Sequence, residues 1–182
     1  MDAAAYPDLL RAVAFAARAH RHQLRKDGET PYVSHVFRVC LTVRQLFGID
    51  EVPALLAAVL HDTIEDTNTD YDDIAEAFGA QVADWVAALT KNKGLPEEER
   101  EKDYCRRLAA APWQVKACKL ADVYDNLQDS RTGSKSPLKT IPRSRMYLEV
   151  LDVPDLPPVA RRAWEVVQRL LEEREKEVPA AK

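Results

Sequence analysis

Apolar residues recur along this chain at the three- and four-residue spacing of helices that bury one face. Proline near the start of several segments and glycine near the end of others are typical of helix boundaries. No long run alternates apolar and polar residues as a half-buried strand would. The expected helices cover about residues 7–22, 32–47, 52–66, 70–78, 82–89, 97–110, 112–127, 145–151 and 157–176.

The composition agrees with this pattern. The chain is rich in Ala, Leu, Val, Glu and Arg, and only 5 of its 182 residues are glycine. With 46% hydrophobic residues it can bury a core of ordinary size. We therefore expect an all-α protein with a compact helical fold and a single domain over residues 1–182. Its core should span about residues 5–150, followed by helices within 151–176 and a frayed tail at 177–182.

Charge and cysteine content narrow the range of partners. The net charge of −4, from 26 basic and 30 acidic residues, argues against a general nucleic-acid binder, which would usually be basic. The 3 cysteines lack paired spacing and are typical of thiols in a reducing compartment. No apolar run reaches the roughly 18 residues that a membrane span needs, and the N-terminal residues do not resemble a signal peptide. We expect a cytoplasmic protein that binds neither membranes nor nucleic acid.

The densest chemistry lies in the six residues His61-Asp62-Thr63-Ile64-Glu65-Asp66, directly after the apolar segment 52–60. On a continuous helix His61 and Glu65 would share one face, and Asp62 and Asp66 the adjoining one. Ionised carboxylates at the end of a buried helix are costly unless a cation or hydrogen-bond donors compensate them. This arrangement is typical of one half of a divalent-metal site.

The other half must come from elsewhere in the chain, where His20, His35 and Asp122 each lie on or near an apolar helix face. A histidine in such a place is often only a hydrogen-bonded core residue, and Asp122 could instead pair with Lys119, although that order of charges is the poorer one on a helix. His35, His61, Asp62 and Asp122 together would hold one ion with two imidazoles and two carboxylates. These donors suit Mn²⁺, and Fe²⁺ or Zn²⁺ with less selectivity. Such an ion would acidify water and neutralise phosphate charge.

The residues around these positions resemble a known family. The order His…His-Asp…Asp is the pattern of HD-superfamily metal phosphohydrolases, and the flanking residues are similar to the hydrolase domain of the RelA/SpoT family, especially the stand-alone small alarmone hydrolases. The likeness covers about residues 5–150. It rests on Ala19-His20, Arg25-Lys26-Asp27-Gly28, Pro31-Tyr32-Val33-Ser34-His35, the run from Ala57 to Thr67, Phe78-Gly79, Leu89-Thr90-Lys91, Lys119-Leu120-Ala121-Asp122 and Asn126.

The resemblance implies a helical HD fold and Mn²⁺-dependent hydrolysis of the 3′-pyrophosphate of guanosine tetra- or pentaphosphate, giving GDP or GTP and pyrophosphate. Its metal ligands would be the two histidines and two aspartates named above: His35, His61, Asp62 and Asp122. Glu65 and Asp66 match the acidic pair that positions and activates water. Arg25 and Lys26 match the basic pair that flanks the nucleotide, and Asn126 matches the asparagine that contacts the nucleoside. Relatives of this length can self-associate, so a homo-oligomer is one expectation.

One stretch departs from the family pattern. Where the family commonly has Arg-Leu-His-Asn-Met-Arg-Thr, this chain has Val123-Tyr124-Asp125-Asn126-Leu127-Gln128-Asp129. The arginine expected at position 128 is missing, which puts the substrate contacts on that side in doubt. A basic loop at residues 131–145 could compensate by reaching the phosphates, or it could be a solvated loop with no such role.

Two other functions fit the same residues. The chain could be an HD phosphatase acting on another nucleotide, such as the 3′-phosphorylated cofactor NADPH or a nucleoside monophosphate, because Arg25, Lys26 and Asn126 do not distinguish guanine from adenine. It could also be a nucleotide sensor without catalytic activity. Against the sensor, every residue that the chemistry needs is present.

Overall fold

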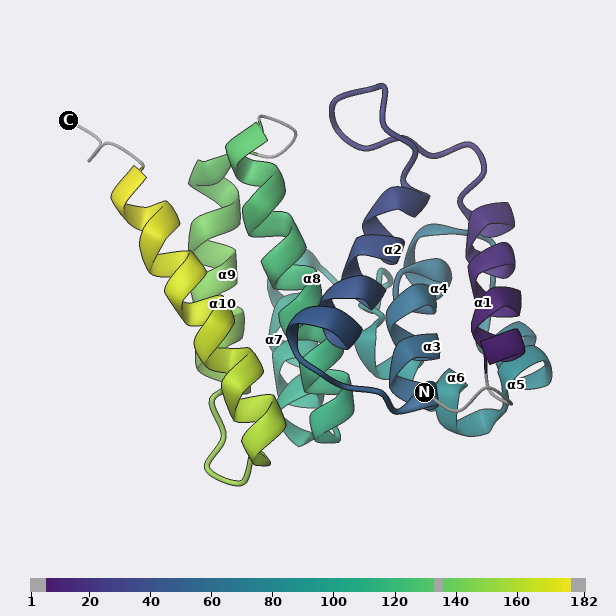
Figure 1. The fold of residues 1–182 in the computed structure, drawn as a ribbon. Coiled ribbons are helices and arrows are strands. Elements are labelled where there is room, and N and C mark those ends of the chain that lie inside the picture. The colour runs from purple at the N-terminus through teal and green to yellow at the C-terminus, as the bar shows by residue number, and fades with distance from the viewer. Residues whose placement is uncertain (1–5, 133–135, 178–182) are drawn as a thin grey trace.

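The computed structural model describes residues 6–132 and 136–177, without the side chains of 131 and 132. Over this part of the chain the structure is helical, and the only strand-like feature is an isolated bridge between Leu24 and Pro31. The expected all-α class is therefore confirmed (Figure 1). The elements are α1 (Tyr6–Ala19), α2 (Val33–Leu41), the π-helical segment η2 (Thr42–Leu46), α3 (Val52–Leu60), α4 (Thr63–Asp66), α5 (Tyr71–Phe78), α6 (Ala80–Leu89), α7 (Glu97–Ala110), α8 (Trp113–Thr132), α9 (Pro137–Leu151) and α10 (Pro158–Glu177).

Helix α3 lies at the centre of the fold. Every residue from Ala54 to Leu60 is buried, as expected for a helix that is apolar on all sides. It packs against α1, α2, α6 and α8, which come from both halves of the chain. The residues that follow α3 therefore lie deep in the protein.

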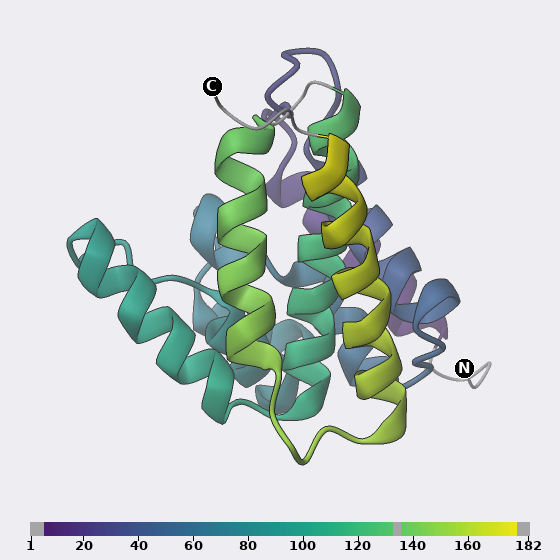
Figure 2. The ribbon, with the colours of Figure 1, turned by 90° about the vertical axis from the view of Figure 1, so that its left-hand side faces the viewer.

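Helices α8, α9 and α10 lie side by side and form the C-terminal part of the fold (Figures 1 and 2). Helix α7 leans away from this group and contacts α9 and α8 (Figure 2). Arg174 of α10 is buried and donates to the carbonyl oxygen of Leu127 and to Oε1 of Gln128, at 3.4 and 3.0 Å. These contacts help to carry α8 past residue 127, where the sequence pattern placed its end.

The predicted continuous helix over 52–66 is wrong at one important point. Helix α3 ends at Leu60, His61 and Asp62 form a turn, and the short α4 follows. The break leaves helical carbonyl groups without backbone partners. Two side chains bind them: His61 Nδ1 lies 2.9 Å from the oxygen of Ala58, and the Thr63 hydroxyl donates to that of Leu60 at 2.6 Å. The turn is thus stable although it is buried.

The predicted basic loop over 131–145 is also wrong. Helix α8 continues to Thr132 and α9 begins at Pro137, so most of this stretch is helical. Proline is tolerated in the first helical turn, where its missing N–H would have no partner, but Pro142 lies inside α9. The Ser, Thr and Pro content was therefore misleading. Lys135, the Arg131 side chain and the tail at 178–182 lie outside the described residues.

Candidate functional site

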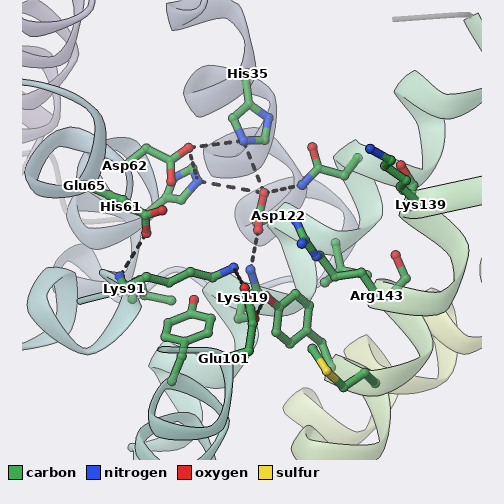
Figure 3. A pocket seen from close by; sticks show the side chains of 18 of the residues that line it. His35, His61, Asp62, Glu65, Lys91, Glu101, Lys119, Asp122, Lys139 and Arg143 are labelled. Carbon is green, nitrogen blue, oxygen red and sulfur yellow. Dashed lines mark hydrogen bonds and ion pairs between the residues drawn. The ribbon is translucent and has the colours of Figure 1, made fainter. Parts of the chain in front are cut away.

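A pocket with a volume of about 780 Å³ opens where the loop before α2, the α3–α4 turn, α7, α8 and α9 meet (Figure 3). Pockets of about 300–1,000 Å³ are usual for small-molecule ligands. Of the residues predicted to act in the site, all except Arg25 line this pocket: Lys26, His35, His61, Asp62, Glu65, Asp66, Asp122 and Asn126.

Two imidazoles and two carboxylates converge at the bottom of the pocket. His35 Nε2 lies 3.5 Å from Asp62 Oδ2 and 3.2 Å from Asp122 Oδ1. His61 Nε2 lies 3.0 and 4.0 Å from the same two oxygens. Donor atoms of His35, His61 and Asp62 all lie within 4.8 Å of one another, so these three residues could hold a metal ion. The sequence-predicted ligands, distant along the chain, are thus brought together.

The orientation of both imidazoles fits metal binding. Each Nδ1 is engaged behind the site, His61 with the Ala58 carbonyl oxygen and His35 with Asp125 Oδ2 at 2.6 Å. Each Nε2 points toward the carboxylates, and that of His61 is buried without a hydrogen-bond partner among the described residues. A buried polar atom without a partner is costly, and an ion at this place would remove that cost.

The spacing of the donor atoms was tested against a divalent cation. Ligand atoms about 2.1 Å from a common ion lie roughly 3 to 4.2 Å from one another, depending on the angle between them. The four N···O distances above, between 3.0 and 4.0 Å, fall within this range. The residues therefore fit a divalent ion with mixed imidazole and carboxylate ligands.

The charges in the cluster call for a cation. Burial alone would lower the pKa of His35, but its hydrogen bonds to Asp122, Asp125 and Asp62 outweigh burial and raise the pKa to about 10. Burial also opposes ionisation of the carboxyl group of Asp62, yet the adjacent imidazoles hold its pKa well below the usual range. Without a metal, a proton on His35 thus supplies the positive charge.

Glu65 and Asp66 follow one turn later and line the same pocket. Glu65 Oε2 accepts a hydrogen bond from the backbone N–H of Lys91 at 2.9 Å. Burial, together with the nearby carboxylates of Asp62 and Asp66, raises the pKa of Glu65 despite this bond. Asp66 pairs with Lys93 Nζ at 2.9 Å. Glu65 is therefore more strongly basic than an ordinary glutamate, and its position is fixed by the backbone N–H of Lys91.

Sequence reasoning missed Tyr32 and Lys119 as site residues, although both belong to the motifs that carry the family resemblance. The Tyr32 hydroxyl donates to Asp62 Oδ2 at 2.6 Å. Lys119 Nζ lies 2.8 Å from Asp122 Oδ2, while Asp122 Oδ1 faces the imidazoles. Asp122 therefore forms the ion pair with Lys119 that was considered as an alternative, and it also takes part in the cluster.

Several positive side chains also line the pocket. Lys91 pairs with Glu101 at 2.6 Å on one side. Lys139 and Arg143 of α9 lie on the other side (Figure 3). Arg143 Nη2 is 3.9 Å from the exposed Glu97, at the limit of an ion pair. Lys139 and Arg143 belong to the stretch 131–145, which the sequence analysis expected to be a basic loop that could reach the phosphates. In the structure they project from a helix instead.

Arg25 takes a different position from Lys26. It is buried, pairs with Asp129 through Nε at 3.1 Å and also through Nη2, and donates weakly to Asn126 Oδ1 at 3.4 Å. Asn126 in turn donates to Asp122 Oδ1 at 2.7 Å. The guanidinium thus lies behind the pocket wall, and its place beside the nucleotide, which the resemblance implies, stays a prediction.

Gln128, which replaces the expected arginine, points away from the pocket. Its Nε2 donates to the Tyr124 hydroxyl at 3.1 Å, and its Oε1 accepts from Arg174. His20 is buried near the cluster, where its ring stacks on Tyr32 and its Nδ1 lies 2.7 Å from Gln23 Oε1. His20 therefore supports the pocket wall.

Comparison with known proteins identifies relatives of this chain. A model of the HD domain family matches residues 12–153. Guanosine-3′,5′-bis(diphosphate) 3′-pyrophosphohydrolase MESH1 of Danio rerio is 42% identical over 122 residues, 66% of this chain and 68% of that protein. The human MESH1 protein is 43% identical with the same coverage. A guanosine-3′,5′-bis(diphosphate) 3′-pyrophosphohydrolase of Aquifex aeolicus is 35% identical over 78% of this chain, but over only 20% of its own length.

Solved structures agree with this grouping. One, described as a metazoan ortholog of SpoT that hydrolyzes ppGpp, superposes with a TM-score of 0.77 at 28% identity, covering 89% of this chain and 94% of that one. A Listeria monocytogenes protein superposes with a TM-score of 0.68 at 27% identity, covering 80% and 96%. Among the described residues, no helix is both long and apolar enough to cross a membrane.

Metal binding should release protons. At neutral pH the ion must displace the proton that the carboxylates hold on His35, whose pKa is raised to about 10. We expect about one proton or more to be released per ion, and the apparent affinity to rise with pH up to about 10. Calorimetric titration in buffers of different ionisation enthalpy measures the release. Binding without proton release, or with an affinity that falls as pH rises, would contradict the charge state described for the cluster.

Proposed function

We propose that this chain, which belongs to the HD domain family, hydrolyses the 3′-pyrophosphate of guanosine tetra- or pentaphosphate. The products are GDP or GTP and pyrophosphate. The observation that carries the proposal is the cluster of His35, His61, Asp62 and Asp122 with Glu65 directly beside it in one pocket. The names and titles of the related hydrolases support the choice of substrate.

We propose that the four residues of this cluster bind one Mn²⁺ ion. Mixed nitrogen and oxygen donors without a cysteine suit Mn²⁺, with Fe²⁺ and Zn²⁺ as the alternatives. When bound, the ion supplies positive charge that acidifies water and stabilises negative charge on the reacting phosphate. Lys119 binds Oδ2 of Asp122 and leaves Oδ1 facing the imidazoles. The Tyr32 hydroxyl donates to Oδ2 of Asp62, the same oxygen that faces His35 and His61, and so helps to fix the position of that oxygen.

Glu65 then acts on the attacking water. The backbone N–H of Lys91 holds its carboxylate at the pocket wall, and burial raises its pKa, so it accepts a proton more readily than an exposed glutamate. Asp66, one residue later, helps to orient the water and is itself positioned by Lys93. A pyrophosphate leaving group needs in-line attack and charge neutralisation more than it needs a covalent nucleophile.

The substrate carries several negative charges, and the cations on the pocket wall match them. We propose that Lys139 and Arg143 of α9 bind phosphate oxygens, with Lys26, which lines the same pocket, as a further cation. Asn126 contacts the nucleoside from α8, and Arg25 supports Asn126 from behind. A single hydrolase domain over residues 1–182, a cytoplasmic location and self-association stay predictions.

The direct test is turnover by purified protein. With Mn²⁺ and guanosine tetraphosphate, we expect GDP and pyrophosphate, resolved by ion-exchange chromatography. Loss of activity on chelation and its return with added Mn²⁺ is the matched control. Orthophosphate from NADPH without reaction on the alarmone would instead favour the other phosphatase, and metal-dependent binding without turnover of either would favour a sensor.

Substitution of Glu65 and substitution of a metal ligand should have different effects on metal content and turnover. Glu65→Gln keeps the shape of the side chain but removes the base, so we expect kcat to fall at least about 10²-fold while the bound metal is retained. Asp62→Ala should lose both metal and turnover. Metal content by mass spectrometry and steady-state kinetics distinguish these outcomes. Near-normal turnover of Glu65→Gln would remove Glu65 from the mechanism.

Arg143 should contribute to substrate binding. We expect Arg143→Ala to raise KM by about tenfold, the scale of one charged hydrogen bond of ~1.5 kcal/mol, with metal content unchanged. Lys102→Ala is the matched control, because Lys102 is an exposed α7 cation whose partner is Glu98 and which does not line the pocket. An unchanged KM for Arg143→Ala, or an equal rise in both variants, would contradict a phosphate contact.

A further inference from the structure

Asp125 is a buried carboxylate to which the family resemblance gives no role. It lies on α8, one helical turn after Asp122, at the position where the family run commonly has histidine. It is only 4% exposed. A carboxylate buried to this extent is costly unless it is paired, so its partners show what it does.

One partner is the imidazole of His35. Asp125 Oδ2 lies 2.6 Å from Nδ1, on the side of the ring away from the pocket. On the pocket side, Nε2 of the same ring faces Asp122 and Asp62. The imidazole is therefore held between the candidate metal ligands and a carboxylate from the neighbouring helix.

The other main partner is Arg38, one turn after His35 on α2. Its Nε donates to Asp125 Oδ1 at 2.5 Å and its Nη2 donates to Asp125 Oδ2 at 2.9 Å. Such a two-point contact fixes the plane of the carboxylate as well as its charge. Arg25 Nη2 adds a more distant positive charge at 3.9 Å. Two arginines thus compensate Asp125 and keep it ionised.

An ionised carboxylate can only accept hydrogen bonds. His35 Nδ1 must then carry the proton that is donated to Asp125, so the neutral ring has its lone pair on Nε2, which faces the cluster. The Ala58 carbonyl oxygen, also only an acceptor, selects the same tautomer in His61. A carboxylate behind an imidazole also makes the ring a stronger ligand.

We propose that Asp125, held by Arg38, is a positioning residue that fixes the tautomer and orientation of His35 for metal binding. This inference rests on the proposed metal site. It gives a function to Asp125, which stands where the family commonly has histidine. In this chain the support for His35, the first histidine ligand, comes from α8, the helix that also carries Asp122.

The test is metal affinity in Asp125→Asn, measured with Mn²⁺ by competition with a chromogenic chelator. If the asparagine oxygen accepts from Arg38, its NH₂ group faces His35 Nδ1 and favours the tautomer with the proton on Nε2, which cannot bind the ion. We expect the affinity to fall by about 10–100-fold. Asp129→Asn is the control, because Asp129 pairs with the same two arginines, Arg38 and Arg25, so the variant shows whether the loss of a carboxylate charge beside them is by itself enough to weaken binding. It should bind Mn²⁺ as the parent does.

Nitrogen-detected NMR of Zn²⁺-loaded parent protein gives a second result that needs no variant. In the parent we expect His35 to carry its proton on Nδ1 and to show a slowly exchanging Nδ1–H signal. In Asp125→Asn this signal should shift or disappear. Parent-like Mn²⁺ affinity in Asp125→Asn, or a His35 proton on Nε2 in the parent, would overturn the role of Asp125. If instead the parent binds no ion that Asp62→Ala abolishes, the proposed metal site itself fails.

Discussion

The site depends on the compensation of buried negative charge. Asp62, Asp122 and Asp125 surround the imidazole of His35, and without partners such a group of carboxylates would strongly destabilise the fold. Lys119 pairs with one oxygen of Asp122, and Arg38 binds both oxygens of Asp125. The remaining carboxylate oxygens, Asp62 Oδ2 and Asp122 Oδ1, face the small volume beside the Nε2 atoms of His35 and His61. A divalent cation has the charge and the donor preference to occupy it.

The fold makes this arrangement possible by ending α3 at the right residue. Because α3 is buried on every side, the turn that follows it carries His61 and Asp62 into the interior. The same break frees two carbonyl groups, and one of them orients the His61 ring. Glu65 follows on α4, close to the cluster, where the backbone of Lys91 holds it. The proposed ligand pair, His61 and Asp62, therefore lies in the turn, and the proposed water-activating pair, Glu65 and Asp66, lies in α4.

Much of this was predictable from the sequence, and the failures have physical causes. The helical spacing identified the all-α class, and the motifs around His35, His61 and Asp122 indicated which residues meet. The break at His61 was missed because 3.6-residue spacing continues across it, while the capping contacts that stabilise it involve side chains. The first half of α9, before residue 145, was missed because Ser, Thr and Pro content outweighed spacing, although packing against α8 and α10 stabilises the helix. Asp125 was missed because its partners lie on α2, about 90 residues away.

The proposed metal site places one divalent ion between α2, the α3–α4 turn and α8. Anomalous diffraction from crystals grown with Mn²⁺ tests this placement. We expect a single strong peak within bonding distance of the Nε2 atoms of His35 and His61 and of carboxylate oxygens of Asp62 and Asp122. A peak elsewhere in the pocket, or an ordered site with no peak at saturating Mn²⁺, would contradict it.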